Sequence, residues 1–441
     1  MYTKSMRIKD GELYLGSYSL VKLANQYHTP LFVYDELGVM DKISLFKKYF
    51  VSSQFKCEIT YASKAFLAPY LCKLLLKNDV GIDAVSVGDL HLINKSGFPS
   101  NKVLLHGNNK SDHELNAALD MKIQYVVVDS YTELLKLDKL AQARNQVVNT
   151  LFRINPGIHA DTHAYIETSL LSSKFGESLY DEEVIDIIAN IYRNSKYLKF
   201  EGFHAHIGSQ VSNPQSFVAL AKTMINFANN FKQKYNMPIN VLNLGGGFAI
   251  KYQRGETGID LPQLLTVLVQ AVEDELKMND LKIKKLMIEP GRSIIGDSGF
   301  TLYKVGLLKK TFGGKKYVFI DGGMVDNIRP ALYQAKYTVD VANRINKGTE
   351  KESLLASSNL CDVVGKCCES GDIVAEGVNI GEVYKGDTLI VYSTGAYCYS
   401  MSMNYNGLLR GAVIFVNGDK ITEVIKRQTL DDLVTNHNFE V

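Results

Sequence analysis

Strand-like and helical segments alternate along this chain from residue 58 to residue 288. Runs rich in Val, Ile, Tyr and Phe are separated by segments whose apolar residues recur with helical spacing, such as 182–194 and 261–278. The strand-like runs fall near residues 58–62, 82–86, 102–106, 124–129, 149–154, 199–206, 238–244 and 284–288. Eight strands alternating with helices are the number expected for an α/β (β/α)8 TIM barrel. A doubly wound open sheet is the competing architecture.

Polar or otherwise special residues follow all eight strand-like runs. They are Lys64, Ser86, His106, Asp129, Arg153 with Asn155, His206, Gly245 to Gly247, and Glu289. In a barrel the carboxyl ends of the strands converge on one face, where active sites are built, whereas an open sheet would spread them along an edge. The sequence therefore favours the barrel, with an active site on that face.

The pattern changes after residue 293. Short runs such as "GFTLYKVGLLKK" and "GAVIFVNG", separated by Gly and Asp turns, indicate a C-terminal all-β domain. The N-terminal residues look similar, and 441 residues are too many for one ordinary core. We therefore expect a barrel over residues 35–293, a β domain over 294–441, and an N-terminal segment 1–34 that joins the β domain.

The charge distribution favours a small-molecule substrate. Lys and Arg total 49 against 47 for Asp and Glu, and both signs are scattered, so neither a nucleic-acid surface nor a basic membrane patch is indicated. The N-terminus lacks the apolar core of a signal peptide, and nowhere do about eighteen apolar residues run together, so we expect a cytoplasmic protein. The six cysteines show no repeated CxxC spacing and are interpreted as free thiols.

Lys64 directly follows a strand-like run in "CEITYASKAF". Lysine is rarely buried unless it is paired or used covalently. It either pairs with a carboxylate at the end of the barrel or acts as a Schiff-base lysine, with an amine made nucleophilic by partial desolvation. The residue by itself leaves both interpretations open.

Glycines and a carboxylate follow the last two strand-like runs. The glycines of "NLGGGF" let backbone N–H groups approach an anion, usually a phosphate, although a tight turn is the plainer interpretation. They are not a dinucleotide fingerprint, because Ile250 stands where the third glycine is required. In "MIEPGRS", Glu289 either pairs with Arg292 or keeps a pyridine nitrogen protonated.

His204 and His206 alternate along "FHAHIGSQ", and "HADTH" lies upstream at residues 159–163. Imidazoles at such spacings can converge on a metal, but the sequence has neither HExxH nor an obvious carboxylate partner, so we expect no metal site. A flat imidazole stacked on a cofactor ring suits the same strand end. Together with Lys64, the glycines and Glu289, it completes the set of groups that pyridoxal phosphate (PLP) requires.

Motifs along nearly the whole chain resemble those of the alanine racemase-like, fold-type III PLP decarboxylases, and within that group the enzymes that act on diaminopimelate. They include "YASKAF", "LLHGNNKS", "RINPG", "HAHIGSQ", "LGGGF", "IEPGRS", "DGGMVDNIRPALY", "GKCCESGD" and "TGAYCYSMSMNYN". The resemblance implies a barrel followed by a β domain, and a homodimer with shared active sites. It also implies decarboxylation of meso-2,6-diaminopimelate to L-lysine and CO2, the last step of lysine biosynthesis.

The same resemblance assigns roles around the cofactor. Lys64 matches the lysine that bonds to PLP, His206 the residue stacked on its ring, and Glu289 the partner of its pyridine nitrogen. The positions that match phosphate contacts are Ser209, Gly246, Gly247 and Gly291.

Further matches concern the substrate. Arg292, Arg329 and Tyr333 fall where the family binds the distal carboxylate, and Glu369 where it meets the distal amine. Cys368 occupies the proton-donor position, which in the family comes from the other subunit. Tyr397 lies where a phenol touches cofactor and substrate.

Some positions depart from the family pattern. In "VSVGDL", Val87 and Asp89 replace a glycine and a glutamate, which we expect to alter packing on the cofactor side. Asn243 stands where Asp often precedes the glycines, and with "NYNGLLR" and "KRQ" it is expected to affect dimer contacts. None of these changes removes a catalytic group.

Two alternatives stay open at this point. The first is a PLP decarboxylase of another basic amino acid, such as ornithine or D-lysine, for which Arg329 and Tyr333 would be unnecessary. The second is a non-catalytic regulator on the same scaffold, against which the presence of Lys64 and Cys368 argues.

Overall fold

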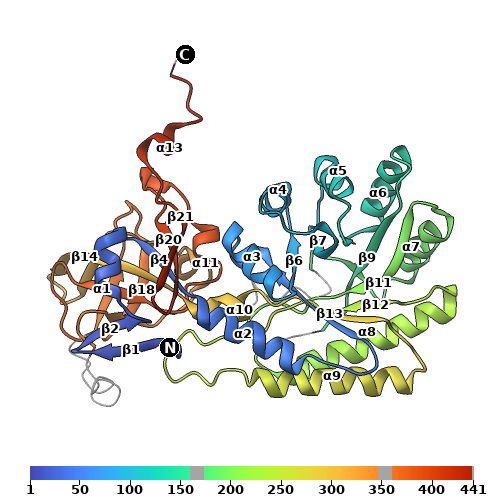
Figure 1. Ribbon diagram of the computed structural model, residues 1–441, viewed down its shortest axis with the longest axis horizontal. Helices are drawn as coiled ribbons and strands as arrows, with labels where there is room; N and C mark the ends of the chain where they lie inside the picture. The colour runs from blue at the N-terminus through green and yellow to red at the C-terminus, as the bar shows by residue number, and fades with distance from the viewer. Residues whose placement is uncertain (159–172, 346–359, 440–441) are drawn as a thin grey trace. The chain divides into compact units, whose positions relative to one another are not determined.

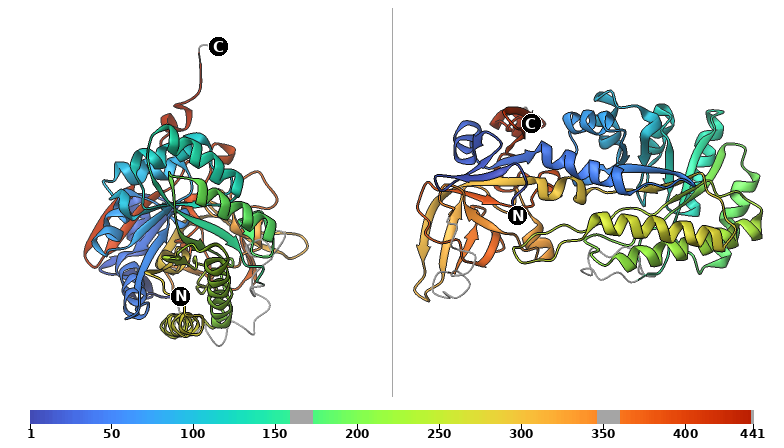
Figure 2. Two further views of the ribbon diagram at one scale, coloured as in Figure 1. Left: turned by 90° about the vertical axis from the view of Figure 1, so that its right-hand side faces the viewer. Right: turned by 60° about the horizontal axis from the view of Figure 1, so that its bottom comes forward.

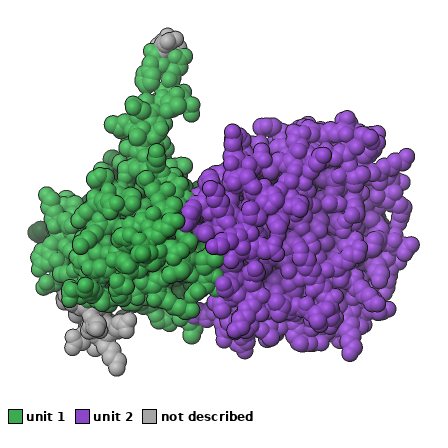
Figure 3. All heavy atoms as spheres, viewed as in Figure 1, with its two compact units in different colours: residues 1–42, 251–257, 294–441 green, residues 43–250, 258–293 purple. Residues whose placement is uncertain are grey.

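The computed structural model describes residues 1–158, 173–345 and 360–439, which form two compact units (Figure 3). The barrel unit comprises Ile43–Ile250 and Gly258–Ser293. The β unit comprises Met1–Lys42, Lys251–Thr257 and Ile294–Val441. Nothing in the sequence pattern indicates that the short segment Lys251–Thr257 belongs to the β unit.

Eight parallel strands form the centre of the barrel unit (Figure 1). They are β5 (Lys56–Ala62), β6 (Gly81–Ala84), β7 (Val103–Leu105), β8 (Tyr125–Val128), β9 (Val148–Asn155), β11 (Leu198–His204), β12 (Val241–Asn243) and β13 (Lys285–Ile288). Each pairs with the next, and β13 pairs with β5, which closes the ring. A two-residue strand, β10 (Glu177–Ser178), is added beside β9. The predicted TIM barrel is confirmed, and each strand overlaps its expected run.

The strands are short and buried on both faces, as expected when helices cover a closed parallel sheet. One apolar cluster within the barrel unit draws its side chains from five strands, namely Leu104, Tyr125, Val127, Leu151, Val241 and Met287. Because this cluster consists of apolar side chains, the barrel has a packed core, and its polar chemistry is placed at the strand ends.

Helices surround these strands, as the left view of Figure 2 shows. They are α2 (Glu36–Tyr49), α3 (Pro69–Lys77), α4 (Val87–Lys95), α5 (Asp112–Met121), α6 (Tyr131–Ala143), α7 (Glu182–Asn194), α8 (Pro214–Tyr235) and α9 (Leu261–Met278). Local sequence explains where they begin. Ser111 and Glu114 form a capping box at the start of α5, and proline occupies the first turn of α8 and of α9.

The β unit combines the two ends of the chain in one sheet. Strand β4 (Leu31–Asp35) pairs antiparallel with β14 (Gly299–Lys310) and parallel with β20 (Ala412–Asn417). The remaining strands of this sheet are β15 (Lys316–Ile320), β16 (Val339–Val341), β17 (Cys361–Val364), β18 (Ile373–Val378), β19 (Thr388–Val391) and β21 (Lys420–Ile425). N-terminal residues therefore form a central strand of the C-terminal sheet.

A smaller three-stranded sheet precedes β4 in the chain. Its strands β1 (Met6–Lys9), β2 (Glu12–Leu15) and β3 (Tyr18–Ser19) are followed by helix α1 (Leu20–Tyr27). Apolar side chains from this sheet and α1 join the core of the large sheet. Within the described residues, no helix combines the length and the apolar character needed to span a bilayer.

Candidate active site

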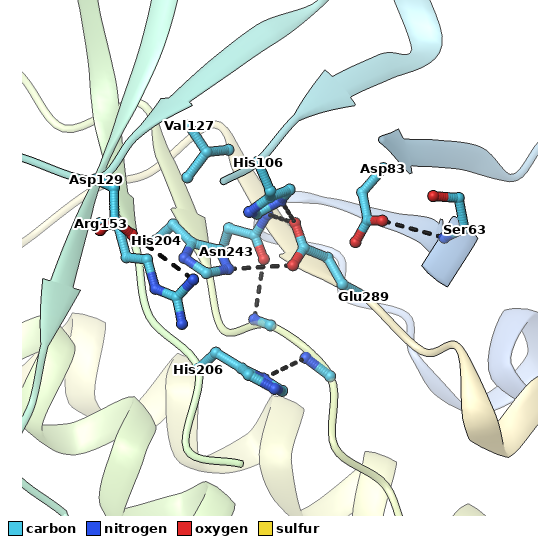
Figure 4. A network of polar contacts seen from close by, with 12 residues as sticks. Ser63, Asp83, His106, Val127, Asp129, Arg153, His204, His206, Asn243 and Glu289 are labelled. Carbon is cyan, nitrogen blue, oxygen red and sulfur yellow. Dashed lines mark hydrogen bonds and ion pairs between the residues drawn. The ribbon is translucent and has the colours of Figure 1, made fainter. Parts of the chain in front are cut away.

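Glu289 lies just past the end of β13 and is almost fully buried, with 7% of its surface exposed. Its Oε1 is 2.8 Å from His106 Nε2 and accepts a hydrogen bond of 2.7 Å from Asn243 Nδ2, while its Oε2 is 3.1 Å from His204 Nε2 (Figure 4). Burial acts to raise the pKa of this carboxyl, but the two histidines hold that pKa well below its usual range. Glu289 is therefore an ionised carboxylate, to which both imidazoles donate.

His206 lies two residues beyond His204 and faces the glycine turn. Its Nδ1 accepts a hydrogen bond of 3.2 Å from the backbone N–H of Gly246. Its pKa is lowered well below the ordinary value, first by burial and then by the charges of Lys64 and Arg153. His206 is therefore a neutral imidazole with its proton on Nε2.

Lys64 is the middle residue of a 3-10 turn, Ser63–Ala65, that directly follows β5. Its neighbours in the turn are buried, but its own side chain is exposed, and its amine forms no hydrogen bond or ion pair with any residue in the described ranges. Burial raises the pKa of Asp83 to about 6, and the charges of His106 and Lys64 oppose that rise. The amine thus acts electrostatically on Asp83 and His206, and the carboxylate pairing considered above is not observed in the described residues.

Backbone segments approach very closely at the glycine turn after β12. A Cβ on Gly246 would lie 2.0 Å from the carbonyl oxygen of Glu289, and one on Gly247 would lie 2.2 Å from that of Gly208. Gly247 also has a φ of +99°, which favours glycine. Only glycine fits these positions, so the ends of β11, β12 and β13 meet in a cradle of backbone.

Arg292 and Ser209 are in direct contact within the barrel unit. Arg292 is buried, and its Nε and Nη2 donate to Ser209 Oγ at 3.2 and 2.9 Å. Gly291, the preceding residue, lies against Ala62 at the end of β5. The structure thus brings a predicted substrate-binding residue and a predicted phosphate-binding residue together.

A second group of predicted residues surrounds Arg329 in the β unit. Arg329 begins helix α11 (Arg329–Tyr333), and its guanidinium lies 5.0 Å from the ring centre of Tyr333 and 5.5 Å from that of Tyr397. Its Nε donates to the hydroxyl of Tyr337 at 3.0 Å, a partner that the sequence does not reveal. Tyr397 has a φ of +61°, a conformation that non-glycine residues adopt mainly where the surroundings enforce it, often at functional sites.

Cys368 and Glu369 lie on the loop between β17 and β18, and both are exposed. The buried carboxylate of Asp372 accepts backbone hydrogen bonds from Met324 and Cys367 at 2.6 and 2.8 Å and so fixes the base of this loop. In the described part of the β unit, no hydrogen bond or ion pair joins either side chain to Arg329.

The structure corrects one expectation and adds residues to the site. Asn243, expected to affect dimer contacts, is buried inside the barrel unit, where it donates to Glu289 and accepts from the backbone N–H of Gly245 at 3.0 Å. His106 also contacts Glu289, although the sequence indicates only that it follows a strand.

His106, His204 and Glu289 each place one atom that could bind a metal within 4.8 Å of the other two. The hydrogen bonds from the two imidazoles to the carboxylate explain why these atoms lie so close together. The "HADTH" histidines lie outside the described residues.

Comparisons with known proteins agree with this geometry. Residues 38–296 match the family model described as "Pyridoxal-dependent decarboxylase, pyridoxal binding domain". The chain is 38% identical to the diaminopimelate decarboxylase of Bacillus subtilis over 98% of this chain and 97% of that one, and 38% identical to that of Staphylococcus aureus over 97% and 98%.

Solved structures give the same result. The diaminopimelate decarboxylase of M. jannaschii in complex with L-lysine superposes with a TM-score of 0.89 at 29% identity, covering 99% of this chain and 98% of that one. The Helicobacter pylori enzyme complexed with L-lysine gives a TM-score of 0.83 at 30% identity, covering 94% and 98%. This chain belongs to the pyridoxal-dependent decarboxylases and, within them, to the diaminopimelate decarboxylase family.

Proposed function

We propose that this protein is a PLP-dependent carboxy-lyase that converts meso-2,6-diaminopimelate to L-lysine and CO2. The observation that carries the proposal is that three groups lie at the same face of the barrel. They are the ionised carboxylate of Glu289, the amine of Lys64, which has no partner in the described residues, and the backbone cradle of glycines after β12. Relatives that match nearly the full length of the chain and are named diaminopimelate decarboxylases support the substrate.

The residues of the barrel unit fit PLP, which supplies an electron sink when it is bound. We assign Glu289 to its ring nitrogen, the neutral His206 to its ring face and Lys64 to its aldehyde carbon. The residues assigned to its phosphate are Ser209, Gly246, Gly247 and Gly291. The cradle supports this assignment, because a phosphate binds where the backbone carries no side chains, as at Gly246 and Gly247, although the N–H of Gly246 itself donates to His206.

We assign the remaining predicted residues to the substrate. Arg292, Arg329 and Tyr333 bind the distal carboxylate, Glu369 binds the distal amine, and Tyr397 contacts both cofactor and substrate. The reacting carboxylate is left without a strong cationic partner, because such a partner would stabilise the ground state. The bond from Cα to this carboxylate breaks with release of CO2, and the Cys368 thiol then donates its proton to Cα.

Carbon dioxide release from several amino acids tests the substrate assignment. The PLP-loaded protein is offered meso-diaminopimelate, L-ornithine, D-ornithine and D-lysine, and we expect turnover of diaminopimelate alone, with lysine as the product. Rapid turnover of ornithine without turnover of diaminopimelate would show that ornithine, and not diaminopimelate, is the substrate. No turnover of any amino acid by fully loaded protein would favour the non-catalytic regulator.

We further propose a homodimer in which Cys368 serves the active site of the partner subunit. The exposure of Cys368 is consistent with this arrangement, because a thiol that acts in the active site of another subunit must lie on the surface of its own. The Lys64→Ala and Cys368→Ala variants should each be nearly inactive. Exchange of their subunits should restore about a quarter of the wild-type activity, because half of the dimers then carry one intact site. No recovery in dimers shown by mass spectrometry to be mixed would place both residues in one subunit's site.

Domain limits and location complete the proposal. We assign PLP binding to residues 35–293 and the completing β domain to residues 294–441 with residues 1–34. All six cysteines are free thiols, which suits the reducing cytoplasm, where we place the protein.

A further inference from the structure

The two histidines in contact with Glu289 have no part in the reaction as proposed above. His106 follows β7, His204 ends β11, and their rings meet edge to face with centres 4.8 Å apart. Each directs Nε2 at a different oxygen of the same carboxylate (Figure 4). This arrangement fixes the rotation of the Glu289 carboxylate as well as its position.

The hydrogen bonds are distributed unequally over the two oxygens. Oε1 accepts from both His106 and Asn243, whereas Oε2 accepts only from His204 among the described residues. A carboxylate oxygen accepts about two hydrogen bonds. One acceptor position on Oε2 is therefore open. The three hydrogen bonds to Glu289 fix the orientation of the carboxylate and so fix the direction of this open position.

His204 is an uncharged donor in this arrangement. Its Nδ1 is buried and has no hydrogen-bond partner in the described residues, so a proton there would be unsatisfied. Burial first, with the charges of His106 and Arg153 adding to it, lowers the pKa of His204 to about 4 although Glu289 acts in the opposite direction. Around neutral pH His204 therefore donates from Nε2 as a neutral ring.

Several other charged or titratable groups act on this cluster from the neighbouring strand ends. Asp83 in β6, Arg153 in β9 and His206 after β11 act on it directly, whereas Lys64 after β5 acts on Asp83 and His206, and Asp129 after β8 acts on Arg153. Arg153 lies 3.8 Å from Asp129, which offsets part of its charge. Any test of His106 and His204 must therefore leave these groups unchanged.

We infer that His106 and His204 are positioning residues, two imidazole donors that hold Glu289 as an oriented carboxylate with one acceptor position on Oε2 open to the protonated ring nitrogen of PLP. The inference rests on the proposed function, since it takes Glu289 as the partner of that nitrogen. It explains why a buried carboxylate stays ionised without a permanent cation in contact with it.

Matched substitutions separate hydrogen bonding from packing. In His106→Gln and His204→Gln the amide nitrogen can donate in place of Nε2, whereas in His106→Leu and His204→Leu no donor is left. We expect each Leu variant to lose kcat by about 10–100-fold, the range found for outer-shell hydrogen-bond partners that orient metal ligands, with KM changed by less than about threefold. The Gln variants should stay close to wild type, as should His91→Leu, which removes an exposed histidine of α4.

The pH dependence gives a readout that packing alone would not change. Without the donors, burial raises the pKa of Glu289, so the carboxylate protonates at higher pH. The visible absorption of bound PLP, recorded without substrate, should then show an acid transition in the Leu variants at least about 1 pH unit above any transition of the wild type. The Leu and Gln variants of one histidine remove the same imidazole charge from the surroundings of Asp83, so the difference between that pair of variants reports the loss of the donor to Glu289.

Side-chain ¹⁵N NMR of histidine in the PLP-free wild-type protein tests the same inference independently of turnover. The spectrum should show His204 protonated on Nε2 and unprotonated on Nδ1 between pH 6 and pH 8. A doubly protonated His204 in that range, equal losses in the Leu and Gln variants, or a bound metal ion in stoichiometric amount would each overturn the inference. If the protein does not turn over diaminopimelate, the proposed function fails, and the NMR result still decides the state of His204.

Discussion

Replacing Glu289 by Gln should lower kcat by at least about 10²–10³-fold, the loss seen when one preorganised hydrogen-bonding group at a reacting centre is removed. Glutamine has nearly the same shape but carries no negative charge, so nothing favours the protonated ring nitrogen that the electron sink requires. KM should change little, because Glu289 has no assigned contact with the substrate. Steady-state kinetics with diaminopimelate measures both constants.

A second substitution controls for the loss of contacts around Glu289. In Glu289→Asp the charge is kept but the carboxylate is withdrawn from His106 and His204, which lie 2.8 and 3.1 Å from it in the wild type. We expect the kcat of this variant to lie between those of the wild type and of Glu289→Gln. If the kcat of Glu289→Gln is within about threefold of the wild-type kcat, the charge of Glu289 is not needed for the reaction.

Lys110→Met should destabilise the barrel unit by about 3–5 kcal/mol. Lys110 is almost completely buried, and its amine donates at 2.7 Å each to the carbonyl oxygens of Gly107 and Val127 and to Oε1 of Glu133. Burial lowers the pKa of Lys110 and raises that of Glu133, while their mutual attraction opposes both shifts. Methionine fills the space but leaves Glu133 buried without its cation. Chemical denaturation measures the loss.

Two further variants identify the cause of that loss. Lys110→Met combined with Glu133→Leu removes both charges and should recover part of the stability. Lys136→Met removes a partly exposed ion pair of 3.6 Å with Asp112 and a hydrogen bond of 3.1 Å to the carbonyl oxygen of Lys110, so it should change the free energy of unfolding by only about 1 kcal/mol. If Lys110→Met is no more destabilising than Lys136→Met, the buried pair does not stabilise the barrel.

The architecture of the barrel could be predicted because its signals are local. Each strand is a short apolar run with a polar residue after it, and each helix has its own apolar stripe, so strand number and order follow from one pass along the chain. The participation of Lys251–Thr257 in the β unit could not be predicted, because it depends on contacts with distant residues such as Thr338.

Candidate site residues could be predicted where a motif or a strand end marked them, as for Lys64 and Glu289. The arrangement around Glu289 could not. His106, His204 and Asn243 come from three strands far apart in the sequence, and only the closed barrel directs them at one carboxylate. The expectation that Asn243 affects dimer contacts is wrong for that reason, since its position in the sequence does not reveal that its amide points into the barrel.

Reduction of the PLP-loaded protein with borohydride, followed by peptide mapping, decides whether Lys64 carries the cofactor, because it fixes the cofactor to the amine that holds it. We expect one pyridoxyl group per chain, on the peptide that contains Lys64, and none in the Lys64→Ala variant. A pyridoxyl group on another lysine, or no modification of a protein that binds PLP, would contradict this expectation.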